Sequence, residues 1–381
     1  MKGLDGGFAE EVTQLFTYLH EHPEISWQEF ETTQFVKRLL EKKGCRIRTF
    51  EDCPGVIGEI GEGSPVIALR ADMDALWQQV KGKFQANHSC GHDAHMTMVL
   101  GVLLALKKRA VIRQGTVRFI FQPAEEKGTG ALKMVEKGVV DDVDYLYGVH
   151  LRPFQEVENG KASPAIVHGA ARLIQGEIIG EDAHGARPHL GKSAIEVGAA
   201  LVNFINEIHL DPMIPYSIKL TKLTAGGKNA NIIPGYGEFS VDLRAQTNAA
   251  MEALYQRLHQ IIQQLSQQFG VDIRFLNMTH VAGAIVNKEA QEVMTESICK
   301  ALGVENLEAP VVTTGGDDFH FYALKRPHIK ATMLGLGCGL TPGLHHPDMT
   351  FDRKALFSGI EILTETVLIT LEKYGGSVDY E

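Results

Sequence analysis

The sequence lacks any long apolar segment. No stretch of its 381 residues approaches the roughly 18 consecutive apolar residues that a membrane-spanning helix requires. Its first residues, MKGLDGGFAEEV, also lack the run of about 7–15 apolar residues that a secretory signal contains. We therefore expect a cytoplasmic protein with no membrane partner.

Positive charge is also in deficit. The chain has 37 Lys and Arg residues against 47 Asp and Glu residues, which gives a formal net charge of −10. Because nucleic acids and anionic membranes select clusters of Lys and Arg, this balance argues against both partners and favours a small-molecule substrate.

Cysteine is scarce, odd in number and widely scattered. The five residues are Cys45, Cys53, Cys90, Cys299 and Cys338. This distribution is typical of reduced thiols and not of a disulfide framework, so a thiol is free to bind a metal ion.

What the sequence has is an alternation of helical and strand-like segments. Apolar residues at helical spacing fill 10–44 and 96–107, whereas 66–69, 117–121 and 145–149 are short runs of strand type. The alternation predicts an α/β domain built on a largely parallel sheet with helices on both faces.

From about residue 170 the order of elements changes. It becomes strand, helix, strand, strand, helix and strand, at 171–179, 193–209, 216–224, 237–243, 251–269 and 271–276. This βαββαβ order is that of a ferredoxin-like unit. We predict a domain inserted at 170–281 into a catalytic domain formed by 1–169 and 282–381.

Two groups of metal-donor residues occur near the middle of the first domain. His88-Ser89-Cys90-Gly91-His92-Asp93-Ala94-His95 precedes a helix, although Asp93 alone would also suit a helix cap. Glu125 and Glu126 follow the strand 117–121, where adjacent carboxylates repel each other unless a cation compensates them. In a metal site one of them can bind the ion while the other serves as general base. The alternative is a solvated helix start.

Further donors lie at other strand ends. His150 follows the strand 145–149, and Leu344-His345-His346-Pro347 lies near the C-terminus. Each histidine alone would more often be structural, but donors that converge on one sheet edge are the pattern of a ligand site. Asp72 and Asp74, after the strand 66–69, can orient ligating histidines from behind or can belong to a surface turn.

Five motifs in this order resemble one enzyme family. They are Arg70-Ala71-Asp72-Met73-Asp74-Ala75-Leu76, Cys90-Gly91-His92-Asp93-Ala94-His95, Phe121-Gln122-Pro123-Ala124-Glu125-Glu126, Gly148-Val149-His150 and His345-His346-Pro347. The chain resembles amidohydrolases related to hippurate hydrolase and the plant auxin–amino-acid conjugate hydrolases, a branch of the aminoacylase and glutamate-carboxypeptidase metallopeptidase clan. The resemblance spans nearly the whole chain.

The resemblance implies a set of site residues. Two divalent ions of zinc, manganese, nickel or cobalt would be bound by Cys90, His92, Glu126, His150 and His345, with Cys90 as the bridging thiolate. Glu125 would be the general base. The resemblance also implies that His184 and Asn231, in the insert, help to hold the substrate carbonyl oxygen, and that the insert forms a homodimer interface.

Several further positions bear on the substrate and on the ligand set. Arg244 is a candidate clamp for a substrate carboxylate, because a guanidinium offers a bidentate fork, but it can also form an exposed salt bridge. Trp77 replaces the usual proline, and Gly316-Asp317-Asp318-Phe319 replaces the usual Gly-x-Glu-Asp-Phe. We prefer His345 to His346 because the family places one residue between the ligand and the proline.

These observations predict a metal-dependent amidohydrolase. A water activated between two cations would attack the amide of a small N-acyl amino acid or related amide, with Glu125 taking its proton. One alternative is dipeptidase or carboxypeptidase cleavage at the same site. Another is a thiol hydrolase with Cys90 as nucleophile and His92 as base, which residues two apart rarely support. The third is a catalytically silent binding protein.

Overall fold

The computed structural model describes residues 6–109 and 114–375, which fall into two compact units. The first unit takes its described residues from Met1–Val167, Ile285–Val312 and Asp317–Glu381, and the second comprises His168–Ala284 and Thr313–Gly316. The predicted insert, 170–281, lies within the second unit. In the described part of the chain, no helix has both the length and the apolar character needed to cross a bilayer.

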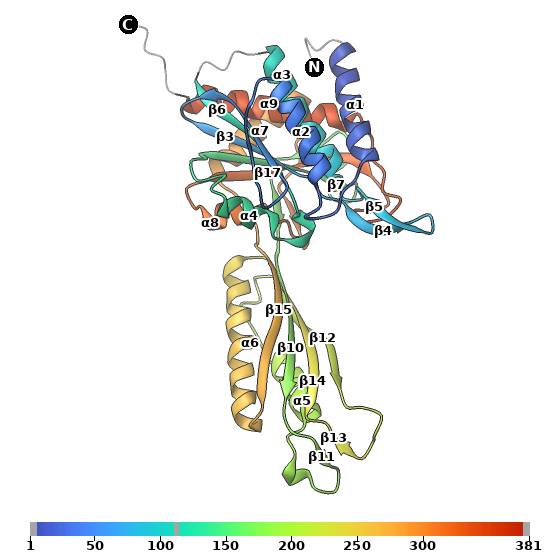
Figure 1. The fold of residues 1–381 in the computed structure, drawn as a ribbon. Coiled ribbons are helices and arrows are strands. Elements are labelled where there is room, and N and C mark those ends of the chain that lie inside the picture. Colours follow the sequence, from blue (N-terminus) through green and yellow to red (C-terminus); the bar gives the residue numbers. More distant parts are fainter. Residues whose placement is uncertain (1–5, 110–113, 376–381) are drawn as a thin grey trace. The chain divides into compact units, whose positions relative to one another are not determined.

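The first unit is built on a seven-stranded sheet with the order β1-β2-β6-β3-β7-β17-β8 (Figure 1). These strands are β1 (Arg46–Thr49), β2 (Val56–Glu62), β6 (Gly115–Gln122), β3 (Val66–Asp72), β7 (Tyr145–Pro153), β17 (Lys330–Leu340) and β8 (Ala162–Ser163). The four central strands are parallel, as the sequence predicts, whereas both edges pair antiparallel. β3 is buried along its whole length, as expected for a strand covered on both faces.

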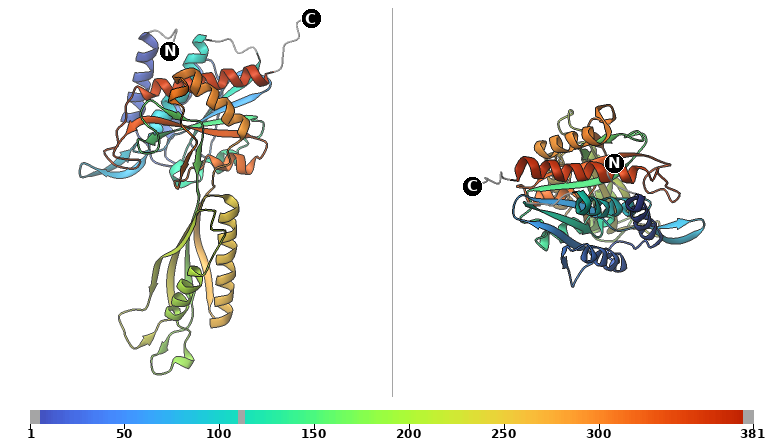
Figure 2. Two further views of the ribbon diagram at one scale, coloured as in Figure 1. Left: turned by 180° about the vertical axis from the view of Figure 1, so that it is seen from behind. Right: turned by 90° about the horizontal axis from the view of Figure 1, so that it is seen from above.

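Helices cover both faces of this sheet (Figure 2). One face packs against α1 (Gly6–Glu21), α2 (Phe30–Lys42), α3 (His92–Arg109), α7 (Lys288–Leu302) and α9 (Ala355–Tyr374), which share a single apolar core with the sheet. Two short helices, α4 (Gly130–Glu136) and α8 (His320–Lys325), lie on the other side, where the ring of Phe319 is close to Gly148 of β7. Helices on both faces are what the alternating pattern predicts.

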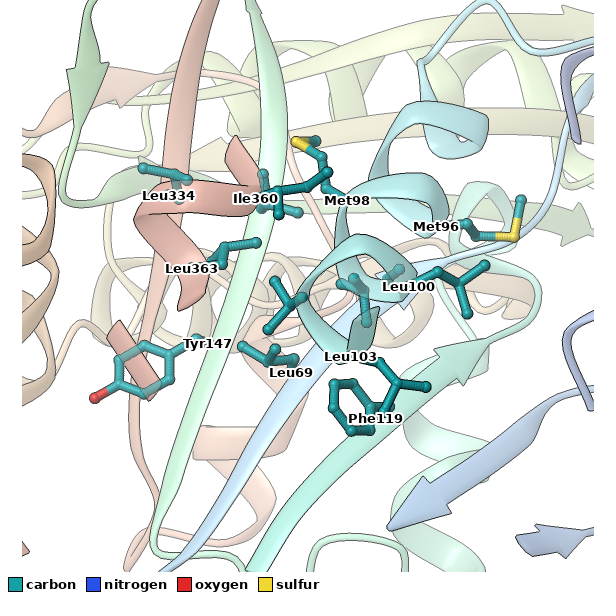
Figure 3. Close-up of a cluster of buried hydrophobic side chains, with 14 of the residues drawn as sticks. Leu69, Met96, Met98, Leu100, Leu103, Phe119, Tyr147, Leu334, Ile360 and Leu363 are labelled. Atoms are coloured by element: carbon teal, nitrogen blue, oxygen red, sulfur yellow. The ribbon is translucent and has the colours of Figure 1, made fainter. Parts of the chain in front are cut away.

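The core is closely packed between α3 and α9 (Figure 3). A Cβ atom on Gly101 of α3 would lie 2.3 Å from Ile360, and one on Gly359 of α9 would lie 2.1 Å from the sulfur of Met98. Each glycine therefore accommodates a large side chain of the opposite helix. This packing seats α3, whose first turn carries His92, firmly on the sheet.

Smaller elements complete the first unit. β4 (Leu76–Val80) and β5 (Lys83–Asn87) form a hairpin of their own, which the sequence pattern did not predict. Single helical turns occur at η1 (Glu125–Lys127) and η3 (Val304–Asn306), and β9 (Ile166–His168) pairs with β16 (Val311–Thr313), where the chain passes from one unit to the other.

The second unit has the predicted βαββαβ order. Its antiparallel sheet, in the order β12-β14-β10-β15, is formed by β12 (Tyr216–Ala225), β14 (Tyr236–Ala245), β10 (Ala170–Ile179) and β15 (Asp272–Val281). α5 (Ala194–Asn206) and α6 (Asn248–Phe269) pack on this sheet through a separate core, and their N-terminal caps are Ser193 and Thr247. β11 (Ala183–His184), β13 (Ile232–Ile233) and η2 (Pro188–Leu190) are short additions.

Candidate metal centre

Donor side chains gather at the carboxyl ends of the parallel strands. Asp72 ends β3, Glu125 follows β6, and His345 follows β17. His150 lies within β7, because that strand continues to Pro153 and does not end at Val149 as predicted. Carboxyl ends of parallel strands meet at one edge of the sheet, so residues more than 250 positions apart in sequence come together there.

Two overlapping groups of three donors form the centre. Cys90, His92 and His150 make one group, and Cys90, Glu126 and His345 make the other, with the donor atoms of each group within 4.8 Å of one another. Cys90 belongs to both groups. Thiol, imidazole and carboxylate are the donors that zinc-type cations prefer, so the residues present fit a pair of such ions.

His92 shows most clearly that protein atoms alone do not satisfy the polar groups of this cluster. Its ring is fully buried, and its Nε2 atom has no hydrogen-bond partner among the described residues. That atom lies 3.8 Å from Glu125 Oε2 and 3.9 Å from Glu126 Oε1. Because buried polar atoms without partners are costly, a cation at this position would satisfy the imidazole and both carboxylates.

His150 is oriented to offer a lone pair to the centre. Its Nδ1 atom hydrogen-bonds the Leu151 carbonyl oxygen at 2.7 Å, so Nδ1 carries the proton. Nε2 then faces Cys90 Sγ at 3.5 Å. This is the tautomer that a metal ligand needs. Burial raises the pKa of the Cys90 thiol, so a nearby cation is required to stabilise the thiolate.

Hydrogen bonds to main-chain amides fix the segment that carries the two adjacent carboxylates. Asp74 accepts hydrogen bonds from the amide of Glu125 at 3.1 Å and from that of Glu126 at 3.0 Å. Glu29, fully buried, accepts one from the amide of Ala124, which has a left-handed φ of 52°. Burial, and then the charges of Asp317, Glu126 and Asp318, raise the pKa of Glu125 well above its usual value. Glu125 is therefore a strong proton acceptor when ionised.

A buried ionic network centred on Arg70 lies next to the donor cluster. Arg70, fully buried, hydrogen-bonds Asp72 at 2.6 Å and Asp318 at 2.8 Å, and it lies 3.3 Å from Asp317. Asp72 also hydrogen-bonds His95 Nδ1 at 2.7 Å. Asp72 and Asp74 are both buried, which excludes a surface turn.

The first turn of α3 contains both a structural carboxylate and a candidate metal donor. Asp93 Oδ1 accepts a hydrogen bond from the amide of Ala94, and its Oδ2 pairs with His20 Nδ1 at 2.6 Å. Asp93 thus has a structural role, while its neighbour His92 faces the donor cluster.

The geometry favours His345 over His346 as a donor. His345 Nε2 lies 3.3 Å from Glu126 Oε1, and hydrogen bonding to Cys90 and Glu126 raises its pKa to about 10. The ring of His346 is engaged elsewhere, since its Nδ1 accepts a hydrogen bond from the amide of Asp348.

The remaining predicted residues belong to the second unit. His184 and Asn231 are diagonal neighbours, because β11 pairs with β13 so that His184 faces Ile232, and the Gly185 amide donates to the Asn231 carbonyl at 2.8 Å. His184 Nδ1 accepts from the amide of Ala186, which leaves the ring proton on Nε2 as a donor. Arg244 is about half exposed and forms a two-point ion pair with Asp242 at 2.7 and 3.0 Å.

Sequence reasoning missed several contributors. Arg70 stood out as the only basic residue of β3, a strand whose residues are all buried, and that signal could have identified it. Glu29 gave no such signal, because its partner, the amide of Ala124, is distant in sequence.

Comparison with known proteins adds an independent line of support. Residues 68–369 match the family model of peptidase family M20/M25/M40. An N-acetylcysteine deacetylase of Bacillus subtilis is 29% identical over 381 aligned residues, covering 97% of this chain and 99% of the relative. The IAA-amino acid hydrolase ILR1-like 5 of Arabidopsis thaliana is 33% identical, covering 80% of this chain and 73% of the relative.

A solved structure extends the likeness to three dimensions. It is that of a Bacillus subtilis protein described as a dinuclear metal-binding peptidase of the M20 family. The two folds have a TM-score of 0.81 at 28% identity, over 97% of this chain and 99% of that chain.

Proposed function

Because the chain belongs to peptidase family M20/M25/M40, we propose that it hydrolyses the amide bond of small N-acyl amino acids, using two divalent cations. The coarser statement, that it is a metal-dependent amidohydrolase or peptidase, follows from the family and from its hydrolase relatives. The names of the deacetylase and of the IAA-amino acid hydrolase both describe cleavage of an acylated amino acid. They support an N-acyl amino acid as the substrate class.

One observation carries the proposal. Two donor triads share Cys90, and a further carboxylate, Glu125, lies beside them without being needed to complete either triad. Cys90, His92 and His150 would hold one ion and Cys90, Glu126 and His345 the other. When bound, the ions supply Lewis acidity and lower the pKa of a water molecule.

Glu125 is the proposed general base. Its carboxylate is held in place through its main-chain amide by Asp74, at the margin of the cluster. It takes the proton of the attacking water and then delivers it to the departing amine, a role worth about 10²–10⁴ in rate.

His184 and Asn231 are proposed to hold the carbonyl oxygen as charge develops on it. The Nε2 proton of His184 and the side-chain amide of Asn231 are donors of the right type, each worth about 3–4 kcal/mol when well placed. Arg244 is proposed to bind the substrate carboxylate. Its present partner, Asp242, would then have to share the guanidinium with the substrate.

The thiol-hydrolase alternative is not favoured by the geometry. Burial, and then the charge of Glu126, raise the pKa of the Cys90 thiol, which disfavours the thiolate in the absence of a cation. A nucleophilic cysteine needs a lowered pKa and an accessible surface. The same mechanism also leaves the paired carboxylates without a role.

The test combines chelation with a panel of substrates. Purified protein is assayed on N-acetyl, N-benzoyl and dipeptide substrates before and after EDTA treatment, and again after addition of zinc, manganese, nickel or cobalt. We expect hydrolysis of N-acyl amino acids that EDTA abolishes and added metal restores. Activity that survives complete metal removal would contradict the proposal, whereas metal-dependent cleavage of dipeptides alone would redirect it to a peptidase.

A further inference from the structure

The β4–β5 hairpin is bound to the donor cluster by one side chain, that of Gln78. Its Nε2 atom donates to the main-chain carbonyl of His345 at 2.7 Å. Its Oε1 atom accepts from Ser89 Oγ at 2.8 Å and from Asn87 Nδ2 at 3.1 Å. A single amide therefore connects β4 to two segments that carry proposed ligands, one ending at Cys90 and one at His345.

The main chain of His345 needs such support. Its φ of 64° is in the left-handed region, which is unfavourable for a residue with a Cβ atom. Two hydrogen bonds hold it there: its amide donates to the Ser89 carbonyl at 2.8 Å, and its carbonyl accepts from Gln78. Asn87 secures the same loop by donating to the Pro347 carbonyl at 3.1 Å.

Packing cannot replace these bonds, because His345 is the most exposed member of the proposed ligand set. Its side chain is 53% exposed, whereas that of Glu126 is 10% exposed. Cys90, His92 and His150 are buried. The direction of the His345 imidazole is therefore set by its main chain more than by its surroundings.

We propose that Gln78 is a positioning residue of the metal centre: its amide fixes the main chain of His345 and so sets the affinity for the ion that His345 holds. The inference rests on the proposed function. Removing a residue that hydrogen-bonds a metal ligand typically weakens metal binding by about 10- to 100-fold. Gln78 is expected to act mainly on this ion, because the triad of Cys90, His92 and His150 does not include the His345 loop and the buried Cys90 is also held by packing.

The test measures metal affinity and does not depend on turnover. Co²⁺ is titrated into metal-free full-length protein in competition with a chelator, and the thiolate-to-cobalt absorption band reports binding at Cys90. Gln78→Met removes all three hydrogen bonds at similar volume. Gln78→Glu keeps the acceptor for Ser89 and Asn87 but loses the donor to His345. We expect both variants to bind one ion about 10- to 100-fold more weakly and the other ion as the wild type does.

Two controls make the result specific. Gln79→Met changes the neighbouring residue, whose amide contacts only the hairpin carbonyl of Gly82, and it should bind both ions normally. In a His345→Ala background, Gln78→Met should weaken the remaining ion less than twofold, because its target is already gone.

The outcomes separate the two proposals. Wild-type protein that binds no cobalt would contradict the proposed function itself. Wild-type protein that binds two ions, together with a folded Gln78→Met or Gln78→Glu variant whose affinities are within twofold of wild type, would overturn the role of Gln78 alone. If circular dichroism shows that one variant is unfolded, the cobalt affinities of the other variant provide the test.

Discussion

At the scale of single residues, two neighbouring glutamates of the same chemistry have different surroundings, and we propose different roles for them. Glu126 belongs to one of the two proposed triads, with Cys90 and His345, whereas Glu125 belongs to neither and groups with Asp317 and Asp318 as well as with His92 and Glu126. Substituting Glu125 should therefore leave metal binding intact.

We expect Glu125→Gln to fold, to bind two ions and to lose about 10²–10⁴ in kcat, since a carboxamide cannot take the proton of water. Metal analysis and steady-state kinetics on the best N-acyl substrate would check this. A variant with at least a tenth of wild-type kcat would remove the assignment of Glu125 as base.

Glu29 makes stability depend on pH. Burial, and then the charge of Asp74, raise its pKa from 4.5 to about 8. The folded protein thus holds this proton more tightly than the unfolded chain, so the free energy of unfolding decreases as pH rises from about 4.5 to 8.

Glu29→Gln keeps an acceptor for the Ala124 amide but has no proton to lose. Relative to wild type, the variant should gain stability as pH rises through that window, by at most about 1.4 kcal/mol per pH unit. Urea unfolding at pH 5, 6, 7 and 8 measures this difference. Parallel pH profiles for the two proteins would mean that Glu29 titrates normally.

The residues that the sequence made predictable were those recognisable by type and by motif. This group comprises Cys90, His92, Glu125, Glu126, His150 and His345, which donor chemistry and the family motifs together predict. Arg70, Glu29 and Gln78 were not predicted, because each acts through partners that only the folded chain brings near. Long-range hydrogen bonds leave no periodic trace in a sequence.

At the scale of elements, apolar runs and helical spacing predicted the central parallel strands and the βαββαβ unit. These patterns did not predict the antiparallel strands toward the edge of the sheet or the separate hairpin. β2 reads Val-Ile-Gly-Glu-Ile-Gly-Glu, and its two glycines weaken a strand signal. The β4–β5 hairpin was missed because its outward side chains include Trp77 and Phe84, both exposed, so that no apolar face marked it.

The close contact of α3 with α9 gives a prediction about elements. Gly101→Ala would place a methyl group 2.3 Å from Ile360, and overpacking of this kind costs about 1–3 kcal/mol of stability. Chemical denaturation of the variant measures this cost. Gly6→Ala in α1, where no atom lies within 4 Å, is the matched control and should be neutral or slightly stabilising.

A substitution of Ile360 tests whether its contact with residue 101 causes the loss of stability. In an Ile360→Ala background, Gly101→Ala should cost less than it does in the wild type, because the clash has been relieved. Strictly additive effects would show that the contact does not determine the packing of these helices.

At the scale of the whole molecule, the proposed ligands come from segments between Cys90 and His345, so bound ions would join distant parts of the first unit. Ligands that bind only the folded state stabilise it, by about 2.7 kcal/mol at a hundredfold excess over Kd. Calorimetry should therefore show a higher Tm with zinc or manganese than with EDTA. Identical transitions in both conditions would contradict such a role.

The central claim is that Cys90, His92, Glu126, His150 and His345 together hold two cations. The most direct test is an anomalous-difference map from crystals grown with zinc or manganese. We predict two peaks, one among Cys90, His92 and His150 and one among Cys90, Glu126 and His345. A map in which no peak lies beside Cys90 would contradict the claim.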